Sequence, residues 1–491
     1  MRWMGCTGEA GLKDTKIRRT QHQLVKNCQQ NRIYKHTHVA LLKKRVSFAR
    51  NHQKLVRLYM HLAVAPRLES PGETVERLLT TVNMDWNLPE CRAIPVAASS
   101  VRVLETPKEF YDFLVERSRY AKFRIVFSTL YFGDGLLEHK LIDSIGSNIE
   151  QNDKLRVDIL LDYLRGTRGV GEEKSSTSLL RTIADKATVY LYHTPKLTGF
   201  VKNVLPERTN EIVGLQHMKV YIFDNSVLIS GANLSDSYFV NRQDRYVLFE
   251  NCKDLADFFH DIINAVGDCS FLLKGDGSIV LHPSCTVHPY EGSFIDYRNL
   301  LRSKVSSVIA SLQAKQISSS QSSSDTLLYP LVQMGLFGYN EEYELLKQIF
   351  CSKANGFFGA AGPSGYIPAL YSWVCERVLT LKDKYARNDV NLYEYHRDGW
   401  TFHAKGLWID TPVQTATLMG SSNFGYRSVH RDLEAEILLV TSNDRLRAQL
   451  KDERKRLFDY SSFLDAAALR RVDHHIPVIV RIVSRMVRNF F

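Results

Sequence analysis

The sequence lacks several features that would place it in other classes of protein. Its eight cysteines include no CxxC pair and no metal-ligand spacing, so we expect buried thiols or a reducing compartment and no disulfide framework. No run reaches the roughly 18 apolar residues of a membrane span, and a transmembrane helix is therefore not expected. Residues 15–68 contain no Asp or Glu, whereas Lys and Arg recur there. An acid-poor, basic leader favours organelle targeting, with a nucleic-acid-binding arm as the alternative.

What is present is the composition of a large globular protein. The chain has 491 residues, 44% of them hydrophobic and 24% charged, with a formal net charge of +11. This length is sufficient for two or three domains with their own cores. The hydrophobic pattern predicts strands at 122–132, 157–161 and 188–192, and helices at 136–145 and near 179–185. This alternation favours an α/β fold with mainly parallel, helix-covered sheets.

One short pattern occurs twice and is the most informative feature of the chain. Both copies read H-x-K-x4-D, and each is followed by an apolar strand, an Asn and a carboxylate. The repeated unit is too long for a solenoid, so it indicates a duplicated domain. The first copy comprises His217, Lys219, Asp224, Asn233 and Asp244, and the second comprises His403, Lys405, Asp410, Asn423 and Glu434.

These residue types suit chemistry at a phosphodiester. On an extended strand, a His and a Lys two positions apart point to the same side, so two copies offer two imidazoles and two ammonium groups. One imidazole can attack phosphorus while the other protonates the leaving oxygen. The Lys and Asn side chains can stabilise the phosphoryl oxygens, and Asp244 and Glu434 can orient the imidazoles. We therefore expect no metal ion and no cofactor.

The motifs resemble those of the phospholipase D superfamily, whose members place two such motifs at the interface of two similar α/β lobes. Within it, the chain is similar to the eukaryotic mitochondrial phosphatidylglycerophosphate synthases, from about residue 100 to the last residue. The stretches that carry this similarity are GWTFHAKGLW at 399–408, SNFGYRSVHRDLEA at 422–435, DYLRGTRG at 162–169 and NGFFGA at 355–360.

The resemblance implies transfer of a phosphatidyl group from CDP-diacylglycerol to glycerol 3-phosphate. The products would be CMP and phosphatidylglycerophosphate, on the route to phosphatidylglycerol and cardiolipin. Phosphatidylserine synthesis, cardiolipin synthesis, phospholipid hydrolysis and nuclease action are the alternatives. The first copy departs from the common Gly-Ser-x-Asn form, because it reads Ser230-Gly-Ala-Asn233. The sequence therefore does not identify which residue supplies the hydroxyl donor in this copy.

Family analogy also assigns roles to residues. His217 is expected to attack the β-phosphorus, while His403 protonates the departing CMP and then deprotonates the acceptor hydroxyl. Asp224 and Asp410 are counted with the catalytic set, although we expect them to hold the site together rather than to touch substrate. The candidates for substrate binding are Asn233, Asn423 and Ser421, and, as phosphate ligands, Arg165, Arg168, Arg427 and Arg431.

The sequence further predicts two tandem lobes related by a pseudo-two-fold axis, with the active site between them. We expect a mitochondrial protein that touches the anionic inner membrane peripherally and binds no nucleic acid. The predicted segments are a basic leader and connector at 1–90, a first lobe at 91–270, a linker with a Ser-rich tract at 271–325, a second lobe at 326–470 and a basic amphipathic tail at 471–491.

Overall fold

The computed structural model describes residues 93–169, 175–198, 213–318, 324–350, 356–357 and 367–470. Every described residue belongs to one compact unit, Thr74–Phe491. The predicted leader at 1–90 and the predicted tail at 471–491 lie outside the described residues. Within the described residues, no helix is both long and apolar enough to cross a membrane.

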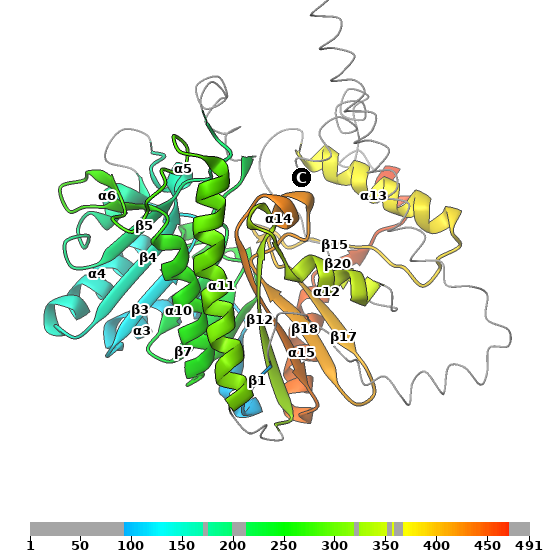
Figure 1. Cartoon of the computed structure of the whole chain (residues 1–491). Helices are drawn as coiled ribbons and strands as arrows, with labels where there is room; N and C mark the ends of the chain where they lie inside the picture. Colours follow the sequence, from blue (N-terminus) through cyan, green and yellow to red (C-terminus); the bar gives the residue numbers. More distant parts are fainter. Residues whose placement is uncertain are drawn as a thin grey trace, which may run out of the picture. The chain divides into compact units, whose positions relative to one another are not determined.

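The first lobe is a nine-stranded sheet with its covering helices (Figure 1). The strand order is β11-β10-β5-β4-β3-β6-β7-β9-β2. The strands are β2 (Val101–Leu104), β3 (Arg124–Ser128), β4 (Arg156–Asp162), β5 (Thr188–Tyr192), β6 (Val220–Phe223), β7 (Ser226–Ser230), β9 (Tyr246–Phe249), β10 (Phe271–Leu273) and β11 (Ile279–Leu281). The helices are α3 (Pro107–Tyr120), α4 (Leu136–Gln151), α5 (Tyr163–Gly166), α6 (Ser176–Leu180), α9 (Asp236–Val240) and α10 (Lys253–Gly267).

The second lobe is a seven-stranded sheet in the order β1-β12-β19-β18-β17-β14, with β13 paired to β12. Its first strand comes from residues 94–95, so the chain enters this sheet before it builds the first lobe. The strands are β1 (Ile94–Pro95), β12 (Thr326–Met334), β13 (Tyr339–Asn340), β14 (Gly356–Phe357), β17 (Gly406–Asp410), β18 (Thr415–Gly420) and β19 (Glu434–Thr441). The helices are α12 (Glu341–Phe350), α13 (Ile367–Lys384), α14 (Tyr426–His430) and α15 (Asp444–Phe458).

The predicted α/β class is confirmed, but the prediction of mainly parallel sheets is wrong. In the first sheet only the pairs β3–β4 and β4–β5 are parallel, and every pair in the second sheet as described is antiparallel. Tight hairpins account for some of the antiparallel pairs. Residues 224–225 alone join β6 to β7, and residues 411–414 join β17 to β18. Parallel neighbours need a crossover of about a dozen residues or more, which these turns do not provide.

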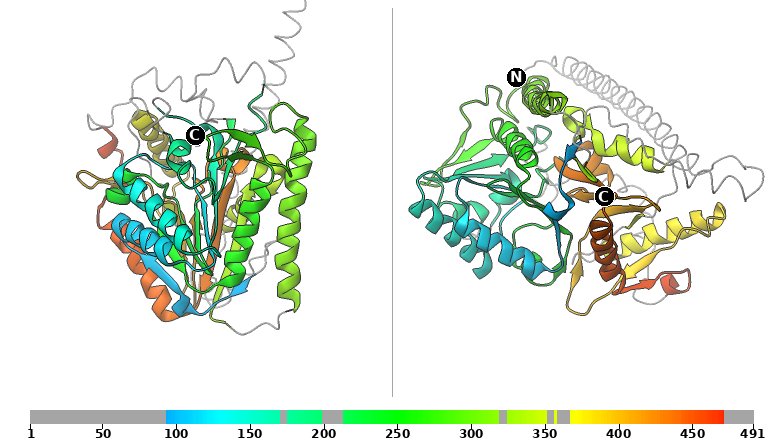
Figure 2. Two further views of the ribbon diagram at one scale, coloured as in Figure 1. Left: turned by 90° about the vertical axis from the view of Figure 1, so that its left-hand side faces the viewer. Right: turned by 90° about the horizontal axis from the view of Figure 1, so that it is seen from below.

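The two sheets share one hydrophobic core. Helix α10 and the long helix α11 (Phe294–Ser318) run side by side (Figures 1 and 2), and both contribute to it. The same cluster includes Val220 of β6, Phe259 of α10, Tyr297 of α11 and Ile437 of β19, all of them buried. Burial of apolar surface from both sheets in a single core stabilises the docking of the lobes. The interface that carries the repeated motifs is therefore a packed part of the fold.

Candidate active site

Two short strand pairings join the lobes at the repeated motifs. Strand β8 (Arg242–Gln243) pairs in parallel with β16 (Thr401–Phe402), and the backbone N–H of His403 donates to the carbonyl of Gln243 at 2.8 Å. In the other copy, residue 216 forms a parallel bridge with Leu433, whose carbonyl accepts from the N–H of His217 at 2.9 Å. The segment before each histidine is thus bonded to the segment before the carboxylate of the other lobe.

As a result, each histidine is held by a carboxylate from the opposite lobe. Nδ1 of His217 lies 3.0 and 2.9 Å from the two oxygens of Glu434, and Nδ1 of His403 lies 2.7 Å from Oδ2 of Asp244. Both carboxylates are buried. A carboxylate accepts from Nδ1–H, so Nε2 of each ring keeps the lone pair. The structure therefore brings the four residues together as two pairs that cross between the copies.

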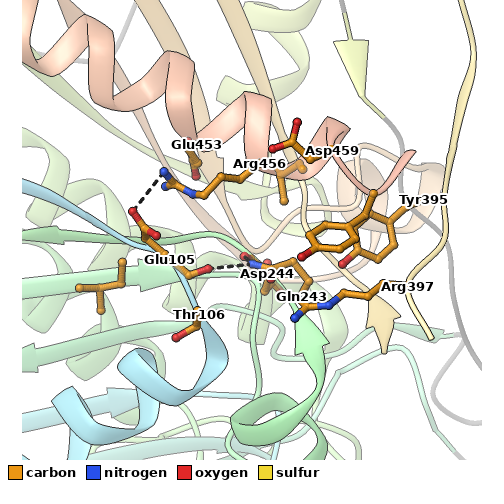
Figure 3. A pocket seen from close by; sticks show the side chains of 12 residues that line it. Glu105, Thr106, Gln243, Asp244, Tyr395, Arg397, Glu453, Arg456 and Asp459 are labelled. Carbon is orange, nitrogen blue, oxygen red and sulfur yellow. Dashed lines mark hydrogen bonds and ion pairs between the residues drawn. The ribbon is translucent and has the colours of Figure 1, made fainter. Parts of the chain in front are cut away.

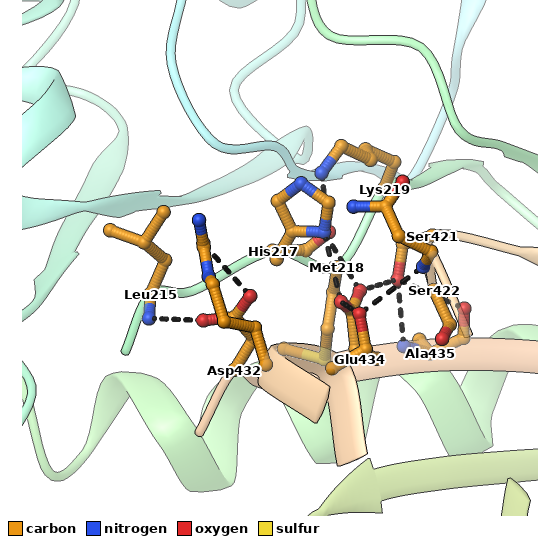
Figure 4. A network of polar contacts seen from close by, with 12 residues as sticks. Leu215, His217, Met218, Lys219, Ser421, Ser422, Asp432, Glu434 and Ala435 are labelled. Carbon is orange, nitrogen blue, oxygen red and sulfur yellow. Dashed lines mark hydrogen bonds and ion pairs between the residues drawn. The ribbon is translucent and has the colours of Figure 1, made fainter. Parts of the chain in front are cut away.

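Glu434 is the centre of a buried polar network (Figure 4). Besides His217, two hydroxyls donate to its oxygens, that of Ser421 at 2.6 Å and that of Ser428 at 2.7 Å. Burial raises the pKa of Glu434, while the positive charge of Lys219 works in the opposite direction. With three donors directed at two oxygens, the position of this carboxylate is tightly determined, and so is the ring that it orients.

The two lysines of the motifs are buried beside their histidines. Nζ of Lys219 donates to the carbonyl of His217 at 2.6 Å. Nζ of Lys405 lies 2.9 Å from Nε2 of His403 and 2.9 Å from its carbonyl oxygen. Burial lowers the pKa of Lys219 well below its usual value and that of Lys405 to about 8. A phosphodiester anion between the two ammonium groups would favour their charged forms.

Both imidazoles are neutral in the free protein. Burial, reinforced by Lys405, lowers the pKa of His403 to about 3. Burial, reinforced by Lys219, likewise holds the pKa of His217 well below its usual value. Although burial works the other way, Lys405 and His403 keep the pKa of Asp244 below its usual value, so this carboxylate stays charged. A neutral ring with an unprotonated Nε2 is the form that a nucleophile or a general base requires.

Asp224 and Asp410, the last residues of the two motifs, do not contact the histidines. This corrects the prediction that counted them among the catalytic residues. Asp224 lies in the turn between β6 and β7, where its carboxylate accepts from the backbone N–H groups of residues 122, 123 and 124. Asp410 ends β17, accepts from the Thr415 hydroxyl at 2.9 Å and pairs with Arg454. At about 3.3 Å per residue, an extended chain puts the acid roughly 20 Å from its histidine. Both acids stabilise the lobes and not the reacting groups.

Ser421 orients the carboxylate rather than the substrate, which corrects a second prediction. Its hydroxyl is fully buried and donates to Glu434. In the first copy the equivalent position is Gly231, where an added Cβ would lie 2.7 Å from Oδ1 of Asp244. The first copy therefore has no room for this hydroxyl. Asp244 accepts instead from the backbone N–H of Arg245 at 2.8 Å.

The two asparagines are not equivalent. Asn233 is buried, and its amide nitrogen donates to the hydroxyl of Tyr238 at 3.1 Å. Asn423 is exposed, and its backbone N–H donates to the hydroxyl of Ser428 at 3.1 Å. Asn233 thus belongs to the buried surroundings of His403, whereas Asn423 faces solvent. Phosphate binding by either side chain stays a prediction.

Among the predicted phosphate ligands, Arg427 has a charge that acts on the motif histidine His217. It pairs with the buried Asp432 at 2.9 Å, and its positive charge contributes to the low pKa of His217. Asp432 also accepts from the backbone N–H of Leu215 at 3.0 Å. The ion pair therefore supports the segment that carries His217, in addition to any contact with substrate.

The other three arginines lie on segments that adjoin the site. The guanidinium of Arg165, in α5, lies 4.5 Å from the centre of the Tyr131 ring, and Arg168 follows α5. Asp162, which caps α5, also accepts from the backbone N–H of the residue before His217 at 3.0 Å. Arg431 directly follows α14, next to Asp432. Their binding of phosphate stays a prediction.

Sequence reasoning missed three residues of the site, namely Tyr238, Ser428 and Asp432. The hydroxyl of Tyr238 lies 3.4 Å from Nε2 of His403, and that of Ser428 donates to Glu434. A signal for the first two was available, because Tyr238 and Ser428 stand at the same distance after the Asn of their copies. Their residue types differ, however, and the repeat alone does not indicate that both face the site.

A cavity of about 260 Å³ lies next to Asp244, the carboxylate that holds His403 (Figure 3). Glu105 and Thr106 line it from the first lobe, and Arg456 from α15. Asp244 also lines it, but neither motif histidine and neither motif lysine does. Glu105 pairs with Arg456 at 3.1 Å across it. The cavity is therefore adjacent to the reacting groups and is not the reaction site itself.

Comparisons with known proteins agree with this architecture. The family described as "Cardiolipin synthase, PLD-like domain" matches residues 371–458. The crystal structure of phosphatidylserine synthase from Haemophilus influenzae Rd KW20 superposes with a TM-score of 0.60 at 18% sequence identity, over 84% of this chain and 96% of that chain. At that level of identity the likeness concerns the fold alone, and it agrees with the α/β architecture of two lobes described above.

Sequence relatives narrow the assignment. The human protein named "CDP-diacylglycerol--glycerol-3-phosphate 3-phosphatidyltransferase, mitochondrial" is 37% identical over 468 residues, which cover 81% of this chain and 84% of the human one. The Saccharomyces cerevisiae protein named "CDP-diacylglycerol--glycerol-3-phosphate 3-phosphatidyltransferase" is 30% identical over 451 residues, covering 78% of this chain and 85% of that one. The predicted resemblance is confirmed, and this chain belongs to the CDP-diacylglycerol–glycerol-3-phosphate 3-phosphatidyltransferase family.

Proposed function

We propose that the protein transfers a phosphatidyl group from CDP-diacylglycerol to glycerol 3-phosphate, giving phosphatidylglycerophosphate and CMP. Membership of the family supports the reaction. The observation that carries the mechanism is the crossed pairing of His217 with Glu434 and of His403 with Asp244, with both lysines alongside. It provides two neutral imidazoles and two lysine side chains at the interface of the lobes, and a phosphodiester anion bound there would favour the charged forms of both lysines.

In the first half-reaction, Nε2 of His217 attacks the β-phosphorus of CDP-diacylglycerol. A nitrogen–phosphorus bond forms, the bond from phosphorus to the bridging oxygen breaks, and its electron pair leaves with CMP. The second ionisation of a phosphate monoester has a pKa of about 6, so CMP departs at neutral pH without needing a proton. Glu434 stabilises the positive charge that develops on the ring of His217. Protonation of CMP by His403, the acid role expected from the sequence, therefore contributes little to the rate of this step.

In the second half-reaction, His403 acts as the general base. Its Nε2 takes the proton from the C1 hydroxyl of glycerol 3-phosphate while the oxygen attacks phosphorus and the bond to His217 breaks. The low pKa of His403 keeps it unprotonated beforehand, and Asp244, 2.7 Å from Nδ1, stabilises the imidazolium that forms. Lys219 and Lys405 neutralise the phosphoryl oxygens in both steps.

We also propose that the protein works in the mitochondrion, peripherally on the inner membrane. The human and chicken relatives carry the word mitochondrial in their names, which supports the compartment. The basic amphipathic sequence at 478–491, outside the described residues, is the candidate for contact with anionic lipid. Flotation of the full chain, and of a folded chain truncated at 477, with anionic liposomes tests this; equal binding by both would remove the tail from the proposal.

The identity of the lipid product tests the proposed reaction. The purified protein is supplied with CDP-diacylglycerol and, in parallel, with glycerol 3-phosphate, serine, phosphatidylglycerol or water, and the lipids are identified by mass spectrometry. Phosphatidylglycerophosphate in the first reaction alone is expected. Phosphatidylserine, cardiolipin or phosphatidic acid as the main product would replace the proposal with the corresponding sister activity.

The roles of the histidines are tested with CDP-diacylglycerol that is labelled with ³²P in the phosphatidyl phosphate. After an early quench and denaturation, label should remain on the wild type and on His403→Ala, but not on His217→Ala. His403→Ala should retain the label for longer after glycerol 3-phosphate is added, because the base of the second step is missing. Label on His217→Ala but not on His403→Ala would reverse the two roles.

A further inference from the structure

The two catalytic histidines have different surroundings at Nε2, although Nδ1 of each lies within hydrogen-bond distance of a carboxylate from the other lobe. The hydroxyl of Tyr238 lies 3.4 Å from Nε2 of His403, and the two rings meet edge to face with centroids 5.1 Å apart. The guanidinium of Arg242 lies 4.7 Å from the centre of the Tyr238 ring. Tyr238 is 3% exposed. Tyr238 is therefore a buried side chain that packs directly against His403.

The hydrogen bonds around Tyr238 have a definite direction. The amide nitrogen of Asn233 can only donate, so the Tyr238 oxygen accepts from it at 3.1 Å. Burial keeps the pKa of Tyr238 above its usual value, so the hydroxyl retains its proton. That proton is available for the lone pair on Nε2 of His403. Donors then run from Asn233 through Tyr238 to His403, and from Nδ1 of His403 to Asp244.

The second copy is built differently at the equivalent position. Ser428 stands there in place of Tyr238, and its hydroxyl donates to Glu434, on the Nδ1 side of His217. Among the residues that the structure describes, none makes a hydrogen bond to Nε2 of His217. Among those residues, Nε2 of His217 therefore has no hydrogen-bond partner. Nε2 of His403, in contrast, lies near both the Tyr238 hydroxyl and Nζ of Lys405, which also approaches Nδ1 of the same ring at 2.5 Å.

From this asymmetry we propose that Tyr238 is a positioning residue that makes the two histidines unequal, holding His403 as the base for the acceptor hydroxyl and leaving His217 as the nucleophile. The inference rests on the proposed function and extends it to a residue outside the repeated motif. A hydroxyl that donates to a ring nitrogen stabilises the unprotonated ring and occupies its lone pair until another hydroxyl replaces it. The acceptor of the second half-reaction is such a hydroxyl.

Tyr238→Phe tests the proposal, because phenylalanine keeps the ring contacts with His403 and Arg242 and removes only the hydroxyl. The matched control is Tyr221→Phe. Tyr221 is fully buried in the same lobe, and its hydroxyl donates to the carbonyl of Ala232 at 2.6 Å; within the described part of the chain it makes no hydrogen bond to either histidine. Both variants lose one buried hydroxyl, so a general effect on folding appears in both.

Two rates are measured on the full-length chain, with ³²P-labelled CDP-diacylglycerol as the probe. The first is labelling of the protein without acceptor, and the second is loss of that label after glycerol 3-phosphate is added. In Tyr238→Phe we expect labelling within about threefold of wild type and loss of label slowed by about tenfold, the worth of one hydrogen bond to a reacting group. Equal slowing of both rates, or no change in either, would overturn the proposal.

The pH dependence distinguishes this role from simple packing. The charged groups that face His403 are Asp244, Lys405 and Arg242, and all three remain in the variant. Without the Tyr238 donor, the unprotonated ring is less favoured and the pKa of His403 rises. The defect of Tyr238→Phe in loss of label should therefore grow as the pH falls from about 6 to about 4, where the higher pKa of His403 leaves more of the variant's ring protonated than of the wild-type ring. A defect that is constant over this range would contradict the proposal.

A second substitution covers the case in which Tyr238→Phe does not fold. Replacement of Tyr238 by 3-fluorotyrosine keeps the hydroxyl and makes it a stronger donor, so the transfer step should become less sensitive to low pH than in wild type. An opposite or absent change would count against the proposal. If the wild type itself acquires no label, the covalent mechanism of the proposed function fails. If the wild type acquires label but the Tyr238 variants show no greater effect than Tyr221→Phe, this inference alone fails.

Discussion

Asp224→Ala should lower the stability of the protein without altering its chemistry, even though Asp224 is the third residue of the repeated motif. Its carboxylate accepts from three successive backbone N–H groups, at residues 122, 123 and 124, with distances of 3.1, 2.7 and 3.2 Å to Oδ1. These groups lead into β3, which pairs with β6. The substitution therefore removes the hydrogen bonds between the β6–β7 hairpin turn and the segment that leads into β3.

The size of the effect follows from these contacts and from the backbone. Three partly exposed hydrogen bonds contribute about 2–3 kcal/mol to the free energy of unfolding. Asp224 has a φ of 53°. Alanine in this left-handed conformation costs about 1 kcal/mol more than a residue such as Asp or Asn. The total loss is about 3–4 kcal/mol, which in a chain of this size corresponds to a fall in Tm of roughly 3–5 °C.

The assay is thermal unfolding followed by circular dichroism, together with kcat measured well below the Tm of the variant. Asp224→Asn is the matched control, since it keeps an acceptor oxygen and tolerates the turn, and it should lose only about 1 kcal/mol. Asp410→Ala, which lacks the strained φ, should lie between wild type and Asp224→Ala in Tm. For all three, kcat per folded molecule should stay within about threefold of wild type.

A fall in kcat of a hundredfold or more for Asp224→Ala, with an unchanged Tm, would refute this reasoning. That result would mean that the acid acts on the reacting groups in a conformation other than the one described. An equal loss of stability in Asp224→Asn and Asp224→Ala would refute the assignment of the loss to the acceptor oxygen and the left-handed turn.

Three further outcomes are expected. Asp244→Asn should slow the transfer of label to glycerol 3-phosphate by roughly 100-fold, because the imidazolium of His403 loses a buried charged partner, and a rate close to wild type would exclude that role. The rate should fall as the pH rises through about 8, where Lys405 loses its proton, and Lys405→Arg, which stays charged, should retain its own rate to higher pH. Activity should persist in EDTA, since Lys219 and Lys405 supply positive charge at the phosphoryl group; silencing by EDTA with recovery on added magnesium would contradict this mechanism.

Local sequence patterns predicted the elements whose structure depends on near neighbours. The strand expected at 188–192 is β5, and the helix expected at 136–145 is α4, which continues to Gln151. In both elements the order of apolar and polar residues follows from burial of one or two faces, and this pattern is visible among near neighbours in the sequence. The direction of strand pairing was predicted wrongly, because it depends on which strands become neighbours rather than on the pattern within each strand.

The candidate residues of the site divide in the same way. His217, Lys219, His403 and Lys405 could be identified from residue type and spacing, since an imidazole and an ammonium two positions apart on a strand have a chemical use wherever the strand lies. Ser421 was assigned to substrate and proved to hold Glu434, because its role depends on a carboxylate from another strand.

The sequence by itself determined the duplicated motif and the family and indicated the candidate reacting groups, because these depend on side-chain chemistry and order along the chain. Only the tertiary structure decided which carboxylate holds which histidine. His217 and Glu434 are 217 positions apart and His403 and Asp244 are 159 apart, so their pairing depends on how the lobes dock. The inequality of the two histidines likewise depends on docking, because the hydroxyl of Tyr238 reaches His403 from the other lobe at a separation of 165 positions. Contacts at such separations arise from the packing of the shared core, which no local pattern records.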